Sequence, residues 1–375
     1  MANVPNLRFT EFSQDWTSSN LKNLLSLLKD GTHGTHADVN KGVFLLSAKN
    51  IKNNSINIDK TDRQISFKDY NKIHANFRLK CGDILITIVG TIGEVALLKH
   101  PENITFQRSV AFLRTNEKMY NVFLFEMIQS KKFQKELEAR KSISAQPGIY
   151  LNDLSHIPIY YPKNKNEQFK IATFINLIDN RIQLQNKIIE DYKILSKAIN
   201  NRLIGKKQAN IKISDCLECI STSKKESEIL EANDGPYPSY GANGLIKNIE
   251  NFEFNQPAIS IVKDGAGVSR MSYLVGNYSI VGTLNLLKAK DNFNLKYLYY
   301  ALKNIDFRSY IVGSGIPHIY FKDYKNELIY VPVNKKTIDT ITTCLSSIDE
   351  LILIEEEKLF KLLLQKKYLL NNMFI

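Results

Sequence analysis

Histidine and cysteine pairs are the side chains of this 375-residue sequence whose spacing could bind a metal ion. His33 and His36 stand in "HGTH", and Cys216 and Cys219 stand in "CLEC", which has the spacing of a zinc knuckle. A structural zinc site needs four ligands, and neither pair has a second pair nearby. We therefore predict that "HGTH" is an ordinary loop, that the two cysteines of "CLEC" are free thiols, and that neither pair forms a metal site.

Motifs for catalysis are missing from the sequence. "DGAG" at residues 264–267 suggests a phosphate-binding loop, but neither G-x-G-x-x-G nor G-x-x-x-x-G-K-[ST] occurs. G-x-S-x-G, H-E-x-x-H and the Asn-Pro-Pro-aromatic tetrad of amino-methyltransferases are also absent. The sequence favours recognition without catalysis, so we expect no catalytic residue and no cofactor bound by this chain.

Several loops combine glycine with small, polar and basic residues, a composition that suits contact with nucleic acid. Glycine lets the backbone approach a partner, Lys and Arg neutralise phosphates, and polar side chains hydrogen-bond to base edges. The loops span residues 29–36, 46–51, 89–93 and 106–109 in the first half and 239–248, 262–270 and 277–285 in the second. The predicted DNA-binding residues are Thr32, His33, Thr35, His36, Lys49, Asn50, Thr91, Gln107, Arg108, Tyr240, Asn243, Lys247, Lys263, Ser269 and Arg270. The alternative for each of these loops is a solvated turn.

The net charge of +12 favours a polyanionic partner, either nucleic acid or an acidic membrane. The excess is uneven: residues 1–160 carry 21 basic and 15 acidic groups, residues 161–206 carry 9 and 4, and residues 207–331 carry 14 and 13. No stretch has the roughly 18 apolar residues of a membrane span, and the start has no signal-peptide pattern. With only four scattered cysteines, a cytoplasmic protein without membrane contact is expected.

Two similar phrases lie 170 residues apart and align without a gap. They are "PGIYLNDLSHIPIYYP" at 147–162 and "PHIYFKDYKNELIYVP" at 317–332. The identities continue beyond the phrase, and they include Ile178 with Ile348, Asp179 with Asp349, Lys197 with Lys367, and Asn201 with Asn371. The segments before each phrase also share an order of strand, glycine turn, strand, strand and helix, and in the first half one helix is predicted over residues 120–139. A whole domain is therefore predicted to be repeated.

A long helix is predicted after each phrase, over about residues 167–203 and 336–371. Apolar residues recur in steps of three and four, at 175, 178, 182, 185, 189, 192, 196, 199 and 203 and at the same places 170 residues on. In both copies the fourth and seventh slots are polar. This is the pattern of a coiled-coil seam, and the simplest way to bury both seams is to pack the two helices on each other. The alternative is two unrelated amphipathic helices on separate cores.

These patterns together predict an α/β (α+β) chain with two similar globular domains, related by a pseudo-twofold axis, and two long helices. The predicted boundaries are 1–162 for the first domain, 163–206 for the central helix, 207–332 for the second domain and 333–375 for the last helix.

The chain resembles the DNA specificity subunits of type I restriction–modification systems. The opening "VPNLRFTEFSQDW", then "DGTHGT", "LLSAKNI" and "CGDILITIVGTIGEVAL", look like the start and first recognition domain of that family. "YPSYGANGLI" and "ISIVKDGAGVSR" look like the second domain, and the repeated phrase with its helix looks like the two conserved regions. The resemblance covers essentially the whole chain.

The resemblance implies two target recognition domains, each reading half of a split double-stranded DNA target in the major groove. It implies two antiparallel helices that act as a spacer and as a docking surface for two methyltransferase subunits, with restriction and translocase subunits added. S-adenosylmethionine, ATP and Mg would belong to those partners. Apolar residues outside the seam are the predicted docking residues: Phe169, Phe174, Leu184, Leu353 and Phe360.

Two other functions remain open from the sequence. One is a single-chain DNA methyltransferase or nuclease with unrecognised motifs, and the other is a scaffold that binds only protein. Steep weakening of DNA binding with salt would exclude the scaffold.

Overall fold

The computed structural model describes residues 4–142, 147–265 and 267–375, so Ala266 of the second glycine loop lies outside the described residues. The chain forms two compact units. The first is assembled from two separate parts of the sequence, and the second from the part between them. Unit 1 comprises residues 1–186 and 357–375, and unit 2 comprises residues 187–356. Two long helices, α5 (Lys165–Asn200) and α10 (Lys335–Asn372), each have one part in unit 1 and the other part in unit 2.

Unit 1 is built on several small sheets. A four-stranded sheet has the order β2-β10-β7-β8, a three-stranded sheet has the order β6-β3-β9, and β1 pairs with β11. A short hairpin of β4 and β5 follows β3 in the chain. The strands are β1 (Thr17–Asn20), β2 (Leu25–Asp30), β3 (Val43–Leu46), β4 (Ile51–Lys52), β5 (Ser55–Ile56), β6 (Gln64–Ile65), β7 (Ile84–Thr87), β8 (Val95–Leu97), β9 (Ile104–Phe106), β10 (Val110–Thr115) and β11 (Pro158–Tyr161). The short helices are α1 (Phe67–Ile73), α2 (Asn121–Ile128), α3 (Lys131–Ala139) and α4 (Leu151–Ser155).

Unit 2 repeats this topology with the same neighbours. Its four-stranded sheet has the order β13-β19-β16-β17, its three-stranded sheet has the order β15-β14-β18, and β12 pairs with β20. The strands are β12 (Ile211–Lys212), β13 (Leu217–Ser221), β14 (Asp234–Gly241), β15 (Gly244–Ile249), β16 (Ala258–Val262), β17 (Met271–Leu274), β18 (Ser279–Ile280), β19 (Leu284–Ala289) and β20 (Leu328–Ile329). The short helices are α6 (Ile213–Cys216), α7 (Glu226–Glu231), α8 (Leu295–Leu302) and α9 (Phe321–Tyr324). The predicted repeat of a mixed α/β domain is confirmed.

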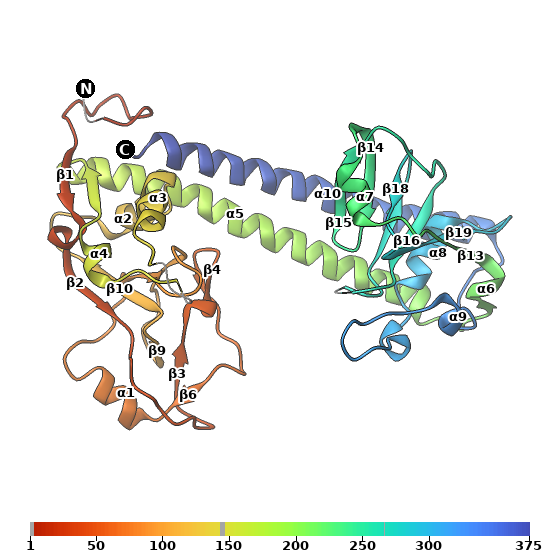
Figure 1. Cartoon of the computed structure of the whole chain (residues 1–375), viewed down its shortest axis with the longest axis horizontal. Coiled ribbons are helices and arrows are strands. Elements are labelled where there is room, and N and C mark those ends of the chain that lie inside the picture. The colour runs from red at the N-terminus through yellow and green to blue at the C-terminus, as the bar shows by residue number, and fades with distance from the viewer. Residues whose placement is uncertain (1–3, 143–146, 266) are drawn as a thin grey trace. The chain divides into compact units, whose positions relative to one another are not determined.

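The two long helices run antiparallel within each unit. In unit 1 the start of α5 lies beside the end of α10, since Ile171, Ile175, Leu369 and Met373 share one buried cluster (Figure 1). In unit 2, Leu203 packs with Ile341 and Leu345 in a second cluster. All nine predicted seam positions in either copy are buried or half-buried. The seam read from the three-and-four spacing is therefore confirmed.

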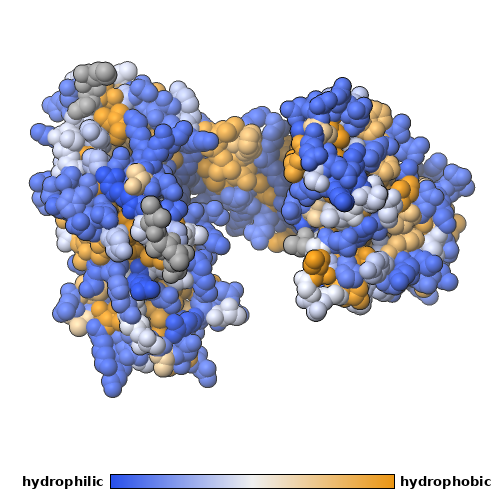
Figure 2. Space-filling model, in the orientation of Figure 1, coloured by the Kyte–Doolittle hydropathy of each residue, from blue (hydrophilic) through white to orange (hydrophobic). Residues whose placement is uncertain are grey.

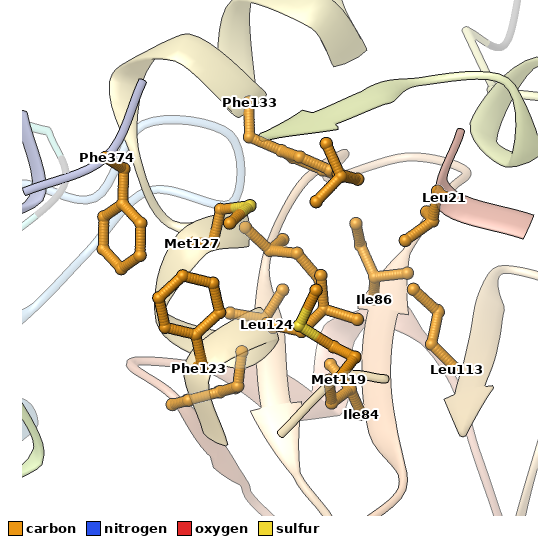
Figure 3. Packing of buried hydrophobic residues seen from close by; sticks show 14 of the residues in the cluster. Leu21, Ile84, Ile86, Leu113, Met119, Phe123, Leu124, Met127, Phe133 and Phe374 are labelled. Carbon is orange, nitrogen blue, oxygen red and sulfur yellow. The ribbon is translucent and has the colours of Figure 1, made fainter. Parts of the chain in front are cut away.

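The core of unit 1 joins its sheet to the long helices through α2. Phe123 and Met127 of α2 share one buried cluster with Phe374 near the end of the chain, and Ile84 and Ile86 of β7 belong to the same cluster (Figure 3). The rings of Phe123 and Phe374 meet edge to face, with their centroids 5.3 Å apart. This apolar contact fixes the C-terminal end of α10 to the domain that precedes α5.

One prediction of the local structure was wrong in detail. The sequence between residues 120 and 139 reads as one helix, but the structure has α2 and α3 with a break at Ser130. The hydroxyl of Ser130 accepts a hydrogen bond from the backbone N–H of Phe133, so it acts as the N-cap of a new helix.

Among the described residues, no helix is both long enough and apolar enough to span a bilayer.

Candidate nucleic-acid interface

Loops from four strands meet at one edge of unit 1 because the pairing of β3 and β9 is parallel. Leu46 lies opposite Phe106, so both strands end at the same side. Beyond the strand ends, the N–H of Gln107 donates to the carbonyl of Leu46 at 2.8 Å. Thr32, just after β2, forms a parallel bridge with Gln107.

The loop after β7 reaches the same edge. The N–H of Ile88 donates to the carbonyl of Ser109 at 2.9 Å, and the Ser109 hydroxyl accepts from the N–H of Ala48 at 3.0 Å. We call segments 31–36, 47–50, 88–93 and 107–109 the unit 1 loop edge. It contains all nine DNA-binding residues predicted in the first half.

The repeated phrase holds the glycine loop of each unit by backbone hydrogen bonds. In unit 1 the N–H of Ile149 donates to the carbonyl of Ile88 at 2.8 Å, and the N–H of Gly90 donates to Pro147. In unit 2 the N–H of Ile319 donates to Lys263 at 2.9 Å, and that of Gly265 donates to Pro317 at 2.9 Å. Gly90 and Gly265 have φ of +84° and +88°, which only glycine adopts readily. The phrase therefore fixes the path of a loop that a candidate ligand would meet.

Unit 2 has an equivalent edge. Tyr240 at the end of β14 lies beside Ile280 of β18 in a parallel pair, and the N–H of Val281 donates to the carbonyl of Tyr240 at 3.0 Å. The N–H of Lys263, after β16, donates to the carbonyl of Thr283 at 2.9 Å. We call segments 222–225, 241–244, 263–265, 267–270 and 281–283 the unit 2 loop edge.

The histidines predicted in the first loop have local partners. His33 is exposed, and its Nε2 lies 2.6 Å from a carboxylate oxygen of Asp30. His36 Nε2 lies 2.9 Å from the hydroxyl of Thr32. No cluster of potential metal ligands occurs among the described residues. The imidazole rings of His33 and His36 are therefore each held by a nearby side chain.

Lys49 and Asn50 have different roles although they are adjacent. Asn50 is buried, and its amide accepts from the N–H of Ser47 and donates to Asn57 and Asp62. The Asp62 pKa is lowered: burial raises it, but hydrogen bonds from Lys49, the Asp59 backbone and Asn50 outweigh that effect. Asn50 therefore supports the loop, because its amide could reach a base edge only by breaking these hydrogen bonds. Lys49, in contrast, is exposed.

The exposed members of the unit 1 loop edge are the better placed to touch a ligand. Thr35, Thr91 and Arg108 are exposed, and Gln107 is half-buried. The backbone N–H of Arg108 donates to the carbonyl of Thr32 at 3.1 Å, so the loop after β9 is held against the loop after β2.

In unit 2 three predicted residues line one cavity. Tyr240, Asn243 and Arg270 surround a space of about 200 Å³, and Arg270 donates to the carbonyl of Ala242 at 3.0 Å. Ser269 has φ of +73°, and Lys263 is half-buried at the start of the same loop. Cavity and cation together suit a polar, anionic ligand.

Lys247 is used inside unit 2. Its ammonium donates to the carbonyls of Leu230 and Ala232 and lies 3.0 Å from a carboxylate oxygen of Asp234. The lysine therefore binds the carbonyls at the end of α7, and this geometry favours a structural role over a phosphate contact.

Both cysteines of "CLEC" are free: Cys216 is buried and Cys219 is half-buried. Burial raises the pKa of both Cys216 and Cys219 to about 11. At neutral pH both groups are protonated, which makes them poor nucleophiles.

Four of the five predicted docking residues are solvent-exposed. Phe169, Leu184, Leu353 and Phe360 are 55%, 60%, 64% and 60% exposed. Phe174 differs because its ring packs edge to face on Phe9, with centroids 5.9 Å apart. Figure 2 shows hydrophobic residues gathered on the exposed part of the long helices.

Sequence reasoning missed the segment 222–225 of the unit 2 loop edge. The N–H of Gly282 donates to the carbonyl of Lys224 at 2.8 Å, as that of Arg108 does to Thr32 in unit 1. Lys224 pairs with Glu253 at 2.9 Å. The segment follows β13 as residues 31–36 follow β2, so aligning the first strands of the two sheets would have found it.

Comparison with known families decides between the functions that the sequence alone leaves open. The family model described as type I restriction modification DNA specificity domain matches residues 13–193 and again residues 205–364. The chain belongs to this family. Each match covers one domain with most of its following helix, so the DNA specificity domain occurs twice.

Two relatives come from Methanocaldococcus jannaschii. The chain is 29% identical to the type I restriction enzyme MjaVIII specificity subunit over 203 residues, which span 52% of this chain and 46% of that protein. It is 24% identical, over 96% of this chain and 93% of the relative, to a protein carrying the name type I restriction enzyme MjaX specificity subunit.

Solved structures have the same fold. The S subunit of a type I restriction–modification system from M. genitalium matches with a TM-score of 0.65 and 18% identity, over 99% of either chain. A chain from a study of assembly and conformational transition of the type I R-M system matches with a TM-score of 0.54 and 15% identity, over 95% of this chain and 96% of that one.

Proposed function

We propose that this chain is the DNA specificity subunit of a type I restriction–modification complex and that each unit reads one half of a bipartite DNA target. The observation that carries the proposal is the duplicated specificity domain with a loop edge in each copy. Two readers on one chain suit a target with two separate half-sites.

The chemistry of the loop edges supports direct readout. Thr35, Thr91 and Arg108 in unit 1, and Asn243 and Arg270 in unit 2, offer donors and acceptors at strand ends. Arg pairs well with the acceptors of guanine, and Asn pairs with adenine, in the major groove. Buried Asn50 and the internally bonded Lys247 would shape these edges without touching bases.

The long helices would set the gap between half-sites and dock two methyltransferase subunits through Phe169, Leu184, Leu353 and Phe360. Restriction and translocase subunits would complete the complex. S-adenosylmethionine, ATP and Mg would be bound by those subunits, and the assembly would work in the cytoplasm. The specificity subunit itself would carry no catalytic group.

The decisive experiment is to express the chain with its methyltransferase partner and sequence the modified DNA. A split methylated motif is expected. Replacing residues 1–160 by the first domain of a related subunit should change one half-site only. A change in both halves, or in neither, would contradict independent reading.

A second measurement separates this function from catalysis by the chain alone. Purified chain is incubated with DNA and labelled S-adenosylmethionine, with and without the methyltransferase subunit. Label should enter DNA only when the partner is present, and label transferred by the chain alone would identify an enzyme.

A further inference from the structure

Unit 2 contains a large groove beside its loop edge. It is bounded by the end of α5, β17, α8 and the middle of α10, and its volume is about 1660 Å³. Small-molecule pockets typically occupy about 300–1,000 Å³, so this open groove is better suited to a stretch of polymer. We call it the unit 2 groove.

Basic side chains dominate the unit 2 groove. Five of them line it, against two carboxylates: Lys193, Lys197, Arg270, Lys296 and Lys303, with Asp349 and Glu356. Lys193 pairs with Glu356 at 2.7 Å, and Lys303 lies 3.9 Å from Asp349. Lys197 forms no ion pair within the part of the chain that the structure describes. The groove therefore keeps positive charge that its own carboxylates do not neutralise.

The groove continues into the loop edge. Arg270 and Ser272 line it together with the small cavity formed by Tyr240 and Asn243. Lys296 lies 4.2 Å from the ring centre of Tyr273, which holds the ammonium on the groove wall. A ligand that met the loop edge of unit 2 would thus find a cationic surface directly beside it.

Unit 1 has a smaller groove at the corresponding place. Its volume is about 470 Å³, and its lining residues are Gln129, Lys131, Leu363, Lys366, Lys367, Leu370 and Asn371. Gln129 accepts a hydrogen bond from Asn54, in the hairpin that follows segment 47–50 of the unit 1 loop edge. This unit 1 groove is also basic, and a hydrogen bond links it to the hairpin that follows a segment of the loop edge.

The two grooves share residues under the 170-residue repeat. Lys197 and Asn201 line the unit 2 groove, and their equivalents Lys367 and Asn371 line the unit 1 groove. Both lysines are exposed and lie outside the helix seam. Packing of the seam therefore does not account for their identity, whereas a ligand common to both halves does.

We propose that the two grooves are matching contact sites for phosphate groups of the DNA backbone, with Lys197 and Lys367 as the repeated phosphate-binding residues. The inference rests on the proposed function and deepens it. It also accounts for the weak charge of residues 207–331, because α5 would supply Lys197 to unit 2. Phosphate contacts position a protein on DNA and carry no sequence information, which explains why both halves can share them.

The test uses the complex of the chain with its methyltransferase subunits. Lys197→Gln, Lys367→Gln and the double variant are compared with wild type in DNA binding from low to high KCl. Each lost phosphate contact should reduce the slope of log affinity against log salt by about 0.9, and the double variant by about twice that. The loss should be equal on target and random-sequence DNA, and the methylated motif should not change. Lys187→Gln on α5 and Lys361→Gln on α10, both exposed and outside the grooves, should leave the slope at the wild-type value.

Three outcomes would overturn the proposal. If the slope of log affinity against log salt is unchanged in the double variant, the two lysines do not contact phosphates. If the slope is unchanged and the methyltransferase no longer co-purifies, the grooves are protein-docking sites. Saturable binding of ATP that the double variant loses, again with an unchanged DNA slope, would assign them to nucleotide phosphates. Absence of any DNA binding by the wild-type complex would instead contradict the proposed function itself.

Discussion

Lys366 Nζ lies 2.6 Å from a carboxylate oxygen of Asp179, and the pair is buried where α10 packs on α5 in unit 1. The ammonium also donates to Gln129 at 2.7 Å and lies 3.8 Å from Glu126 of α2. Lys366 occupies a polar slot of the seam, so one cation ties both long helices to the recognition domain.

Removing this cation should destabilise the chain. In Lys366→Ala, Asp179 would remain buried without its ion pair, and breaking a buried pair costs about 3–5 kcal/mol. Denaturant unfolding monitored by circular dichroism should show the loss. The double variant Asp179→Leu/Lys366→Met removes both charges and should be more stable than Lys366→Ala; equal stability of the two would argue against the pair.

Stability should depend on pH through Glu126. Burial raises its pKa to about 8, against the lowering effect of Lys366, so the folded state holds a proton that the unfolded state releases near pH 4.5. The stabilising effect of that proton is complete below about pH 4.5 and is lost as the pH rises to about 8. Glu126→Gln should therefore gain stability relative to wild type between pH 6 and pH 8.5. Thermal unfolding at both pH values tests this, and a constant difference between the two proteins would contradict it.

Asn50 and Arg108 should respond differently to alanine. Asn50→Ala leaves Ser47 N–H and Asp62 short of a buried partner and should cost about 1–3 kcal/mol. Arg108→Ala alters an exposed side chain and should leave the melting temperature within about 1 °C while weakening binding to the cognate site. Thermal unfolding and DNA binding are measured on both variants. The opposite pattern would exchange their proposed roles.

Charges placed on the exposed helix residues should weaken assembly. Phe169→Glu, Leu184→Glu and Phe360→Glu put a carboxylate on the proposed docking surface and should reduce co-purification of the methyltransferase subunit while circular dichroism stays unchanged. Gln183→Glu and Gln365→Glu are matched controls at exposed polar positions of the same helices. Full recovery of both partners with all three variants would exclude this surface.

The length of α5 should set the unread gap of the DNA target. Four residues inserted after Gln185 add roughly 6 Å and about 40° of net rotation. One base pair adds about 3.4 Å and about 35°, so the rotations agree and a small tilt would absorb the remaining rise. Methylome sequencing should show the same half-sites with a gap one pair longer. A two-residue insertion turns one reader by about 200° and should abolish modification.

The repeat, the long helices and the seam were predictable because they depend on local periodicity and on identity between two parts of one sequence. Side-chain partners were harder to predict. Lys247 has the composition expected of a phosphate contact, yet its partners Leu230 and Ala232 come from the preceding helix. The polar seam residue Lys366 is explained by its ion pair with Asp179 of the other long helix, which is distant in sequence. Periodicity locates such a residue but does not identify what neutralises it.

The hydrogen bonds between the repeated phrase and the two glycine loops have a consequence for how new targets arise. They use only backbone groups, from Ile149 to Ile88 and from Ile319 to Lys263. Neighbouring side chains on the loops can therefore change while the path of the main chain is kept. A descendant of this protein could acquire a different DNA preference by a few surface substitutions, without having to evolve a new way of folding.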